Sequence, residues 1–221
     1  MKHKIDLDKF ERKHSVDFFS TFAVPFVTLT SEVECTGARQ RAKQQGISFF
    51  LYYTHAMLKA TNAIKEFKYR VGAGGKEIYL YDEIHALAII TTGNEGKYNT
   101  LFLPYHDDLL TFATEAQQRI DRLEAADDPF SNEQETLDND RQDLLLISAV
   151  PTLSFTGVNF AQRGSMESYP LSLIGKMTLR EGKEYLPIAI TVNHAFVDGY
   201  HLSQFYEKVR ENLFREAERR R

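Results

Sequence analysis

Two strong strand patterns near the end of the chain limit the folds open to it. Residues 171–179 and 185–192 are rich in strand-forming side chains, and a polar segment, 180–184, separates them. A connection this short joins antiparallel strands, whereas parallel strands need a long crossover. A helix is predicted next by an apolar stripe at Leu202, Phe205, Tyr206, Val209 and Leu213. This hairpin excludes a sheet made only of parallel strands.

Earlier segments add a helix and two further strands. Residues 49–64 predict a well-buried helix because they are apolar on most sides, and Ser48 can cap its first turn. Residues 77–81 and 84–92 predict strands. The glycines within 72–75 precede a strand rather than a helix, so they predict a hairpin turn and not a phosphate-binding loop.

The middle of the chain completes a mixed order of elements. Asp107 or Asp108 can cap a helix that extends to Leu123, and residues 144–149 predict a short strand buried on both faces. Helices and strands therefore mix without strict alternation. We predict an α/β (α+β) two-layer sandwich in which helices pack against a mixed β-sheet.

Composition narrows the class of protein further. The chain has 221 residues and a formal net charge of −4, which favours one domain over 1–221 and gives no reason to expect nucleic acid or an anionic membrane as partner. No segment approaches the roughly 20 apolar residues of a membrane span. With Cys35 as the one cysteine, no internal disulfide or cysteine-based zinc site can form. We expect a cytoplasmic protein without a bound metal.

The segment from Ile190 to His201 is the strongest candidate for chemistry. A strand runs into His194, Asp198 follows four residues later, and Gly199 precedes the final helix. Binding and catalytic groups often lie where strands end. Histidine can act as a general base near neutral pH. From these residues alone, a structural histidine followed by an aspartate that caps the helix is an equally reasonable interpretation.

Several motifs in order resemble one known family. The segment 193–201, Asn-His-Ala-Phe-Val-Asp-Gly-Tyr-His, is similar to the His-x-x-x-Asp-Gly signature of coenzyme A-dependent acyltransferases, which include chloramphenicol acetyltransferases and dihydrolipoyl acyltransferase catalytic domains. Further similar stretches cover nearly the whole chain: 12–14, 62–70, 81–84, 104–108 and 147–155. The resemblance implies the fold of that family and acetyl-coenzyme A as cosubstrate.

The resemblance also implies roles for four residues. His194 would be the general base that takes a proton from an acceptor hydroxyl during its attack on the thioester. Ser148 would donate a hydrogen bond to the oxyanion, and Asp198 would pair with Arg12 to hold the histidine loop. The alternatives are an ordinary strand serine at Ser148, a helix-capping Asp198 and a surface Arg12.

The resemblance also implies residues that contact the acceptor and coenzyme A. Phe18 and Phe19 match an aromatic pair that flanks the acceptor, although core packing would also explain them, and Lys176 matches a lysine near coenzyme A. Three positions depart from the pattern of the chloramphenicol enzymes, and they put chloramphenicol itself in doubt more than acyl transfer: Leu146, Thr152 and Leu173.

The resemblance finally implies a homotrimer with active sites at the subunit interfaces. The predicted reaction is O-acetylation of chloramphenicol or a similar small acceptor, with antibiotic resistance as the associated role. Two alternatives remain. One is the same chemistry on a different hydroxyl or amine, since fold does not determine substrate. The other is a non-catalytic trimeric relative that only binds.

Overall fold

The computed structural model describes residues 1–72, 75, 77–92, 97–125, 141–161 and 169–215. Its strands are β1 (Lys2–Lys4), β2 (Phe26–Glu34), β3 (Tyr69–Val71), β4 (Ile78–Tyr81), β5 (His85–Thr92), β6 (Lys97–Leu103), β7 (Leu144–Val150), β8 (Leu171–Gly175), β9 (Thr178–Arg180) and β10 (Lys183–Asn193). Its α-helices are α1 (Lys13–Phe19), α2 (Ala38–Gln44), α3 (Phe49–Asn62), α4 (Leu109–Glu124) and α6 (Gly199–Arg215). Two 3₁₀ turns, η1 (Leu7–Lys9) and η2 (Lys65–Lys68), complete the described elements.

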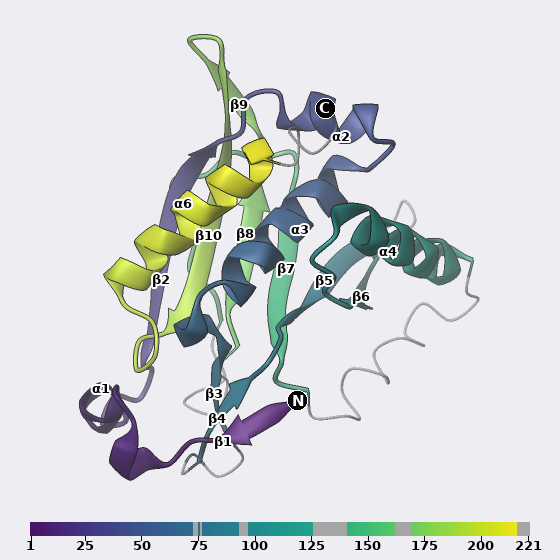
Figure 1. The fold of residues 1–221 in the computed structure, drawn as a ribbon. Helices are drawn as coiled ribbons and strands as arrows, with labels where there is room; N and C mark the ends of the chain where they lie inside the picture. Colours follow the sequence, from purple (N-terminus) through teal and green to yellow (C-terminus); the bar gives the residue numbers. More distant parts are fainter. Residues whose placement is uncertain (73–74, 76, 93–96, 126–140, 162–168, 216–221) are drawn as a thin grey trace.

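A seven-stranded mixed sheet forms one layer of the molecule. Its strand order is β2-β10-β8-β7-β5-β6, with β9 paired to β10. The pairs β5–β7 and β7–β8 are parallel, and the others are antiparallel. A second, three-stranded sheet has the order β1-β4-β3 and lies at one end of the large sheet (Figure 1). The predicted mixed sheet is therefore confirmed.

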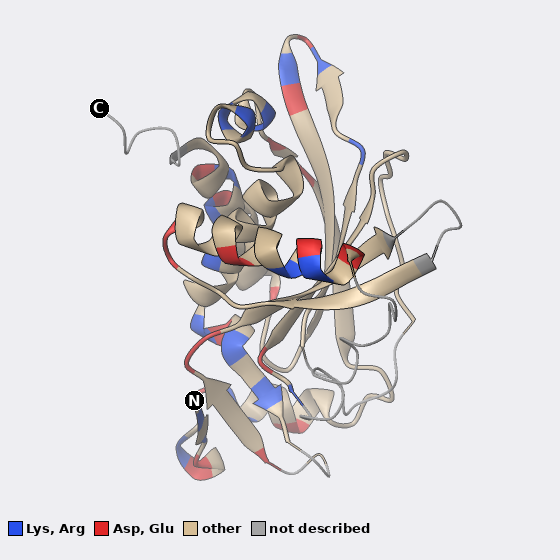
Figure 2. Ribbon diagram, turned by 90° about the vertical axis from the view of Figure 1, so that its right-hand side faces the viewer, with Lys and Arg blue, Asp and Glu red and all other residues tan. Residues whose placement is uncertain are grey.

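Helices α3, α4 and α6 form the second layer, on one face of the large sheet (Figures 1 and 2). The predicted Ser48 cap is present, because its side chain accepts a hydrogen bond from the Leu51 N–H at 3.2 Å. Every residue from Leu51 to Leu58 is buried, as the continuous apolar pattern indicated. Of the two candidate caps for α4, the structure uses Asp108, which accepts from the Thr111 N–H at 2.9 Å.

The expected strand 171–179 is wrong in one respect, because it is interrupted after Gly175. Ile174 pairs with Ile188, and Thr178 pairs with Tyr185. Four steps along β8 and β9 thus face three steps along β10, which is the signature of a β-bulge. The Lys176 N–H donates instead to the Leu153 carbonyl at 2.7 Å. The hairpin itself is confirmed.

The core lies between the sheet and the helices. Along β10, alternate residues Ile188, Ile190 and Val192 belong to the main buried cluster. The intervening residues, including Thr191, point toward the sheet's opposite face because successive strand side chains alternate. Since residues 186–193 are all buried, β10 is the most enclosed strand of the sheet and a fixed base for the loop that follows it.

Candidate active site

The loop after β10 is held in place by its own backbone. Asn193 ends the strand, and its carbonyl accepts the N–H groups of Phe196 and Val197 at 3.1 and 3.0 Å. The Asn193 side-chain oxygen accepts the Ala195 N–H at 2.9 Å. The His194 N–H donates to the carbonyl of Pro25, just before β2, at 2.8 Å. These bonds fix the main chain on both sides of His194.

The hydrogen bond of the His194 ring determines which nitrogen can act as a base. Nδ1 lies 3.1 Å from the Val197 carbonyl oxygen. A carbonyl oxygen accepts only, so the proton must be on Nδ1. In the neutral ring Nε2 then carries the lone pair and can accept a proton. The ring also stacks on Phe19, with 4.4 Å between ring centroids.

Asp198 contacts Arg12 rather than the catalytic candidate. Its Oδ2 accepts from Arg12 Nη2 at 3.2 Å, and Arg12 Nε donates to the Ala195 carbonyl at 3.3 Å. Asp198 Oδ1 accepts the N–H groups of Tyr200 and His201 at the start of α6. Burial raises the pKa of Asp198, but His201 and Arg12 outweigh that effect and lower it overall. The arrangement serves both as a helix cap and as an ion pair.

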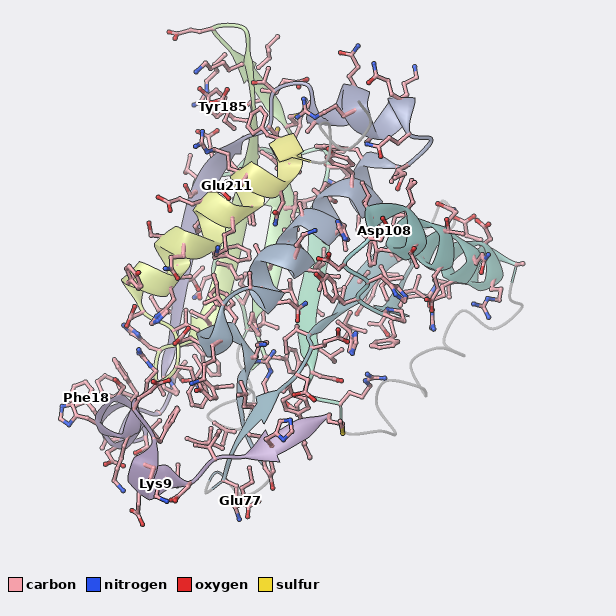
Figure 3. All side chains as sticks on the ribbon, viewed as in Figure 1. Lys9, Phe18, Glu77, Asp108, Tyr185 and Glu211 are labelled. Carbon is pink, nitrogen blue, oxygen red and sulfur yellow. The ribbon has the colours of Figure 1, made fainter. Side chains whose placement is uncertain are left out.

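An aromatic cluster lies beside the His194 loop. The rings of Phe18, Phe19 and Phe22 lie within 5.1 to 5.5 Å of one another. Phe18 is 54% exposed and Phe22 is 46% exposed, so neither is a plain core residue. Phe18 projects from α1 at the end of the sheet where β10 finishes, whereas Tyr185 marks the opposite end of β10 (Figure 3).

A cavity of about 290 Å³ adjoins this cluster. Its walls come from η1, α1, the β3–β4 hairpin and the loop after β10, and they include Phe19, Pro25, Asn193 and Ala195. Most of the lining side chains are apolar. The space beside the histidine loop is therefore suited to a small molecule with an apolar body.

Ser148 lies far from His194 within one chain. It is in register with Leu173 of β8, which is in register with Ala189 of β10, five residues before His194. Five residues of strand span about 16 Å and two strand spacings add about 10 Å sideways, so the two residues are about 19 Å apart. Lys176 follows the other end of β8 and is more distant still. The structure thus brings together His194, Asp198, Arg12 and Phe19, but neither Ser148 nor Lys176.

Two residues near this site were not expected to belong to it. Phe22 completes the aromatic cluster, and Glu66 lies 3.7 Å from His201. Glu66 precedes Asp198 by more than a hundred residues, and no local spacing links them. Among the residues that the structure describes, no group of three or more potential metal ligands is found. None of the described helices is long and apolar enough to cross a membrane.

Comparison with known proteins defines the class. The sequence model named chloramphenicol acetyltransferase matches residues 1–210. A chloramphenicol acetyltransferase from Proteus mirabilis is 24% identical over 208 residues, covering 94% of this chain and 92% of the relative. The Staphylococcus aureus enzyme is 23% identical over 210 residues, covering 95% and 94%.

Solved structures agree with this result. A structure titled chloramphenicol acetyltransferase is 45% identical, with a TM-score of 0.89, and the match covers 96% of this chain and all of that one. A truncated catalytic core of the 2-oxoacid dehydrogenase complex from Thermoplasma acidophilum shares the fold alone, at 13% identity and a TM-score of 0.65 over 96% and 99% of the chains.

The fold and the comparisons define an acyltransferase of the class that uses acetyl-coenzyme A. Within that class, the chain belongs to the chloramphenicol acetyltransferase family.

Proposed function

We propose that this protein transfers the acetyl group of acetyl-coenzyme A to a hydroxyl of chloramphenicol or a similar small acceptor. The observation that carries the proposal is the His194 ring, whose Nδ1 is committed to the Val197 carbonyl while Nε2 stays free to take a proton. A hydroxyl is a weak nucleophile at neutral pH unless a base removes its proton during attack. The names of the relatives supply the acceptor.

The proposed reaction has no acyl-enzyme. Nε2 of His194 takes the hydroxyl proton as the acceptor oxygen attacks the thioester carbonyl, and a tetrahedral intermediate forms. The hydroxyl of Ser148 donates to its oxyanion, a contact that contributes roughly 3 kcal/mol in comparable sites. Collapse breaks the carbon–sulfur bond, and the His194 imidazolium returns its proton to the coenzyme A thiolate.

The proposed active site needs two chains. Ser148 and His194 cannot contact one reacting carbonyl group across about 19 Å within one sheet. A neighbouring copy that contributes Ser148 and Lys176 beside the His194 loop removes this difficulty. We therefore propose a homotrimer in which each active site lies between two subunits, each a single acyltransferase domain over 1–221. A cytoplasmic location and a role in antibiotic resistance belong to the same proposal.

The proposed acceptor site uses Phe18 and Phe19. Their exposed or half-buried rings and the adjoining cavity suit an acceptor with an aromatic or otherwise apolar body. A second candidate, the same chemistry on a different hydroxyl or amine, is favoured by Leu146 and Leu173. Both share the sheet face of Ser148, where the resemblance leads us to expect polar groups.

The test is release of coenzyme A thiol from acetyl-coenzyme A, with and without chloramphenicol, by the wild type and His194→Ala. Release that depends on chloramphenicol and disappears in the variant supports the acceptor and the base together. His14→Ala is the matched control, because His14 lies on the exposed side of α1. No release with chloramphenicol refutes that acceptor, and a panel of hydroxyl and amine acceptors then separates another substrate from a binding-only protein.

A further inference from the structure

His201 lies between two carboxylates just behind the His194 loop. Its Nδ1 is 2.8 Å from Asp198 Oδ1, and its Nε2 is 3.7 Å from Glu66 Oε2. The side chain of His201 is 10% exposed and that of Glu66 is 20% exposed. Carboxylates and imidazoles that leave water at this depth are destabilising unless other polar groups compensate them. Each ring nitrogen of His201 therefore has a specific partner.

Helix capping alone does not account for this arrangement. Asp198 Oδ1 already accepts the N–H groups of Tyr200 and His201, and those bonds need neither an imidazole nor a second carboxylate. The Asp198 N–H also donates to His201 Nδ1 at 3.3 Å, so the ring contacts both the main chain and the carboxylate of Asp198. The opposite nitrogen faces Glu66, which favours a ring orientation with Nδ1 toward Asp198.

A chain of contacts links Glu66 to His194, the proposed base. Val197 directly precedes Asp198, and the Val197 carbonyl holds the Nδ1 proton of His194. Any shift of Asp198 would therefore move the carbonyl that orients the catalytic ring. Arg12 restrains the same loop from the other side, through Asp198 Oδ2 and the Ala195 carbonyl.

We infer that Glu66 and His201 are positioning residues for the base: they hold the Asp198 carboxylate, and through Val197 they fix the ring of His194. This inference rests on the proposed function of His194. Groups that support a reacting side chain in this way act on its orientation, and a misplacement of about 1 Å at a reacting group can lower the rate by a large factor.

The main test compares Glu66→Gln with the wild type. The amide keeps the shape but loses the charge that faces His201. We expect kcat to fall about fivefold while KM for acetyl-coenzyme A changes less than twofold, because orientation of the base is lost and substrate contacts are not. Glu115→Gln is the matched control. Glu115, on α4, lies 2.7 Å from a different histidine, His106. Replacement of Glu115 should leave kcat unchanged.

A second variant separates the link from general destabilisation. The amide oxygen of Asn can replace Nδ1 in His201→Asn, which keeps an acceptor for the Asp198 N–H but removes the ring nitrogen that faces Glu66. In the His201→Asn background, Glu66→Gln should therefore lower kcat no further. Two independent losses that multiply would overturn the inference, as would a Glu66→Gln enzyme with wild-type kcat.

Amide hydrogen exchange distinguishes this inference from the proposed function. The Phe196 and Val197 N–H groups are bonded to the Asn193 carbonyl, and their exchange should accelerate about fivefold in Glu66→Gln but not in Glu115→Gln. A wild type that acetylates no acceptor refutes the proposed function, and exchange then still tests the positioning of the loop. Unchanged exchange at both amides would overturn the inference whatever the activity.

Discussion

The separation of Ser148 and His194 gives a decisive test of a site shared between subunits. One set of chains carries only His194→Ala, and the other carries only Ser148→Ala. Within one chain the two positions are about 19 Å apart, so His194 and Ser148 of the same chain cannot serve one site. In a site made by two neighbours, a chain with intact His194 can meet a chain with intact Ser148.

The expected recovery follows from counting subunit pairs. When equal amounts of the two chains are unfolded together and reassembled at random, half of the His194 positions and half of the Ser148 positions are intact. About one quarter of the sites then have both, so activity should rise to about 25% of wild type. Each homogeneous parent should keep only its residual rate. If both residues acted within one chain, no site would be complete and nothing would be gained.

A second mixture uses the same substitutions in a different arrangement. Wild-type chains are mixed with chains that carry both His194→Ala and Ser148→Ala. A shared site again leaves about one quarter of wild-type activity, whereas a site within one chain leaves about half. Coenzyme A thiol release measures both mixtures, and two different affinity tags confirm mixed assembly. No gain in the first mixture together with half activity in the second would refute the reasoning.

Three further predictions concern stability. Arg70 is 1% exposed, and its guanidinium donates to the carbonyls of Phe67, Tyr69, Gln142 and Leu144. Arg70→Met should therefore lower the free energy of unfolding, measured by urea titration, by about 3 kcal/mol. An unchanged urea midpoint would contradict this. Burial lowers the pKa of His55 to about 4, so the folded state favours the neutral ring. The stability from this preference is fully present above about pH 6.5, and it falls by about 3 kcal/mol as the pH decreases toward 4. Urea titrations at several pH values should show a smaller loss of stability in His55→Gln. A Cβ at Gly175 would lie 2.8 Å from side-chain atoms of Phe155 and Pro187 and 2.9 Å from the Leu153 carbonyl, so Gly175→Ala should lower the unfolding free energy by about 2 kcal/mol, whereas Gly157→Ala, with open space around it, should leave Tm unchanged.

Local patterns predicted the elements that depend on nearby residues. The Ser48 cap, the buried helix α3, the hairpin before β10 and the loop at His194 all follow from short stretches of sequence. The edge strand β2 was not predicted, although Val27, Leu29 and Val33 alternate with polar residues. Most of its side chains are only partly buried, so its hydrophobic signal is weak, and its pairing with β10 spans most of the chain.

The candidate site shows the same division between local and distant information. The order of His194, Asp198 and Gly199 indicated a strand end followed by a helix, and the structure has both. The contact between Glu66 and His201 could not be predicted from spacing, because it depends on how η2 packs beside α6. The distance between Ser148 and His194 likewise appears only once the register of β7, β8 and β10 is known.

The two sides of His194 differ in how much change they can accept. On one side, the loop joins the fully buried end of β10 to α6, which packs against α3, and hydrogen bonds hold its backbone. On the other side, Phe18 and Phe22 are half exposed. Substitutions there can alter the space for an acceptor without moving the base. The fold thus keeps the proposed proton transfer constant while leaving the choice of acceptor open to variation.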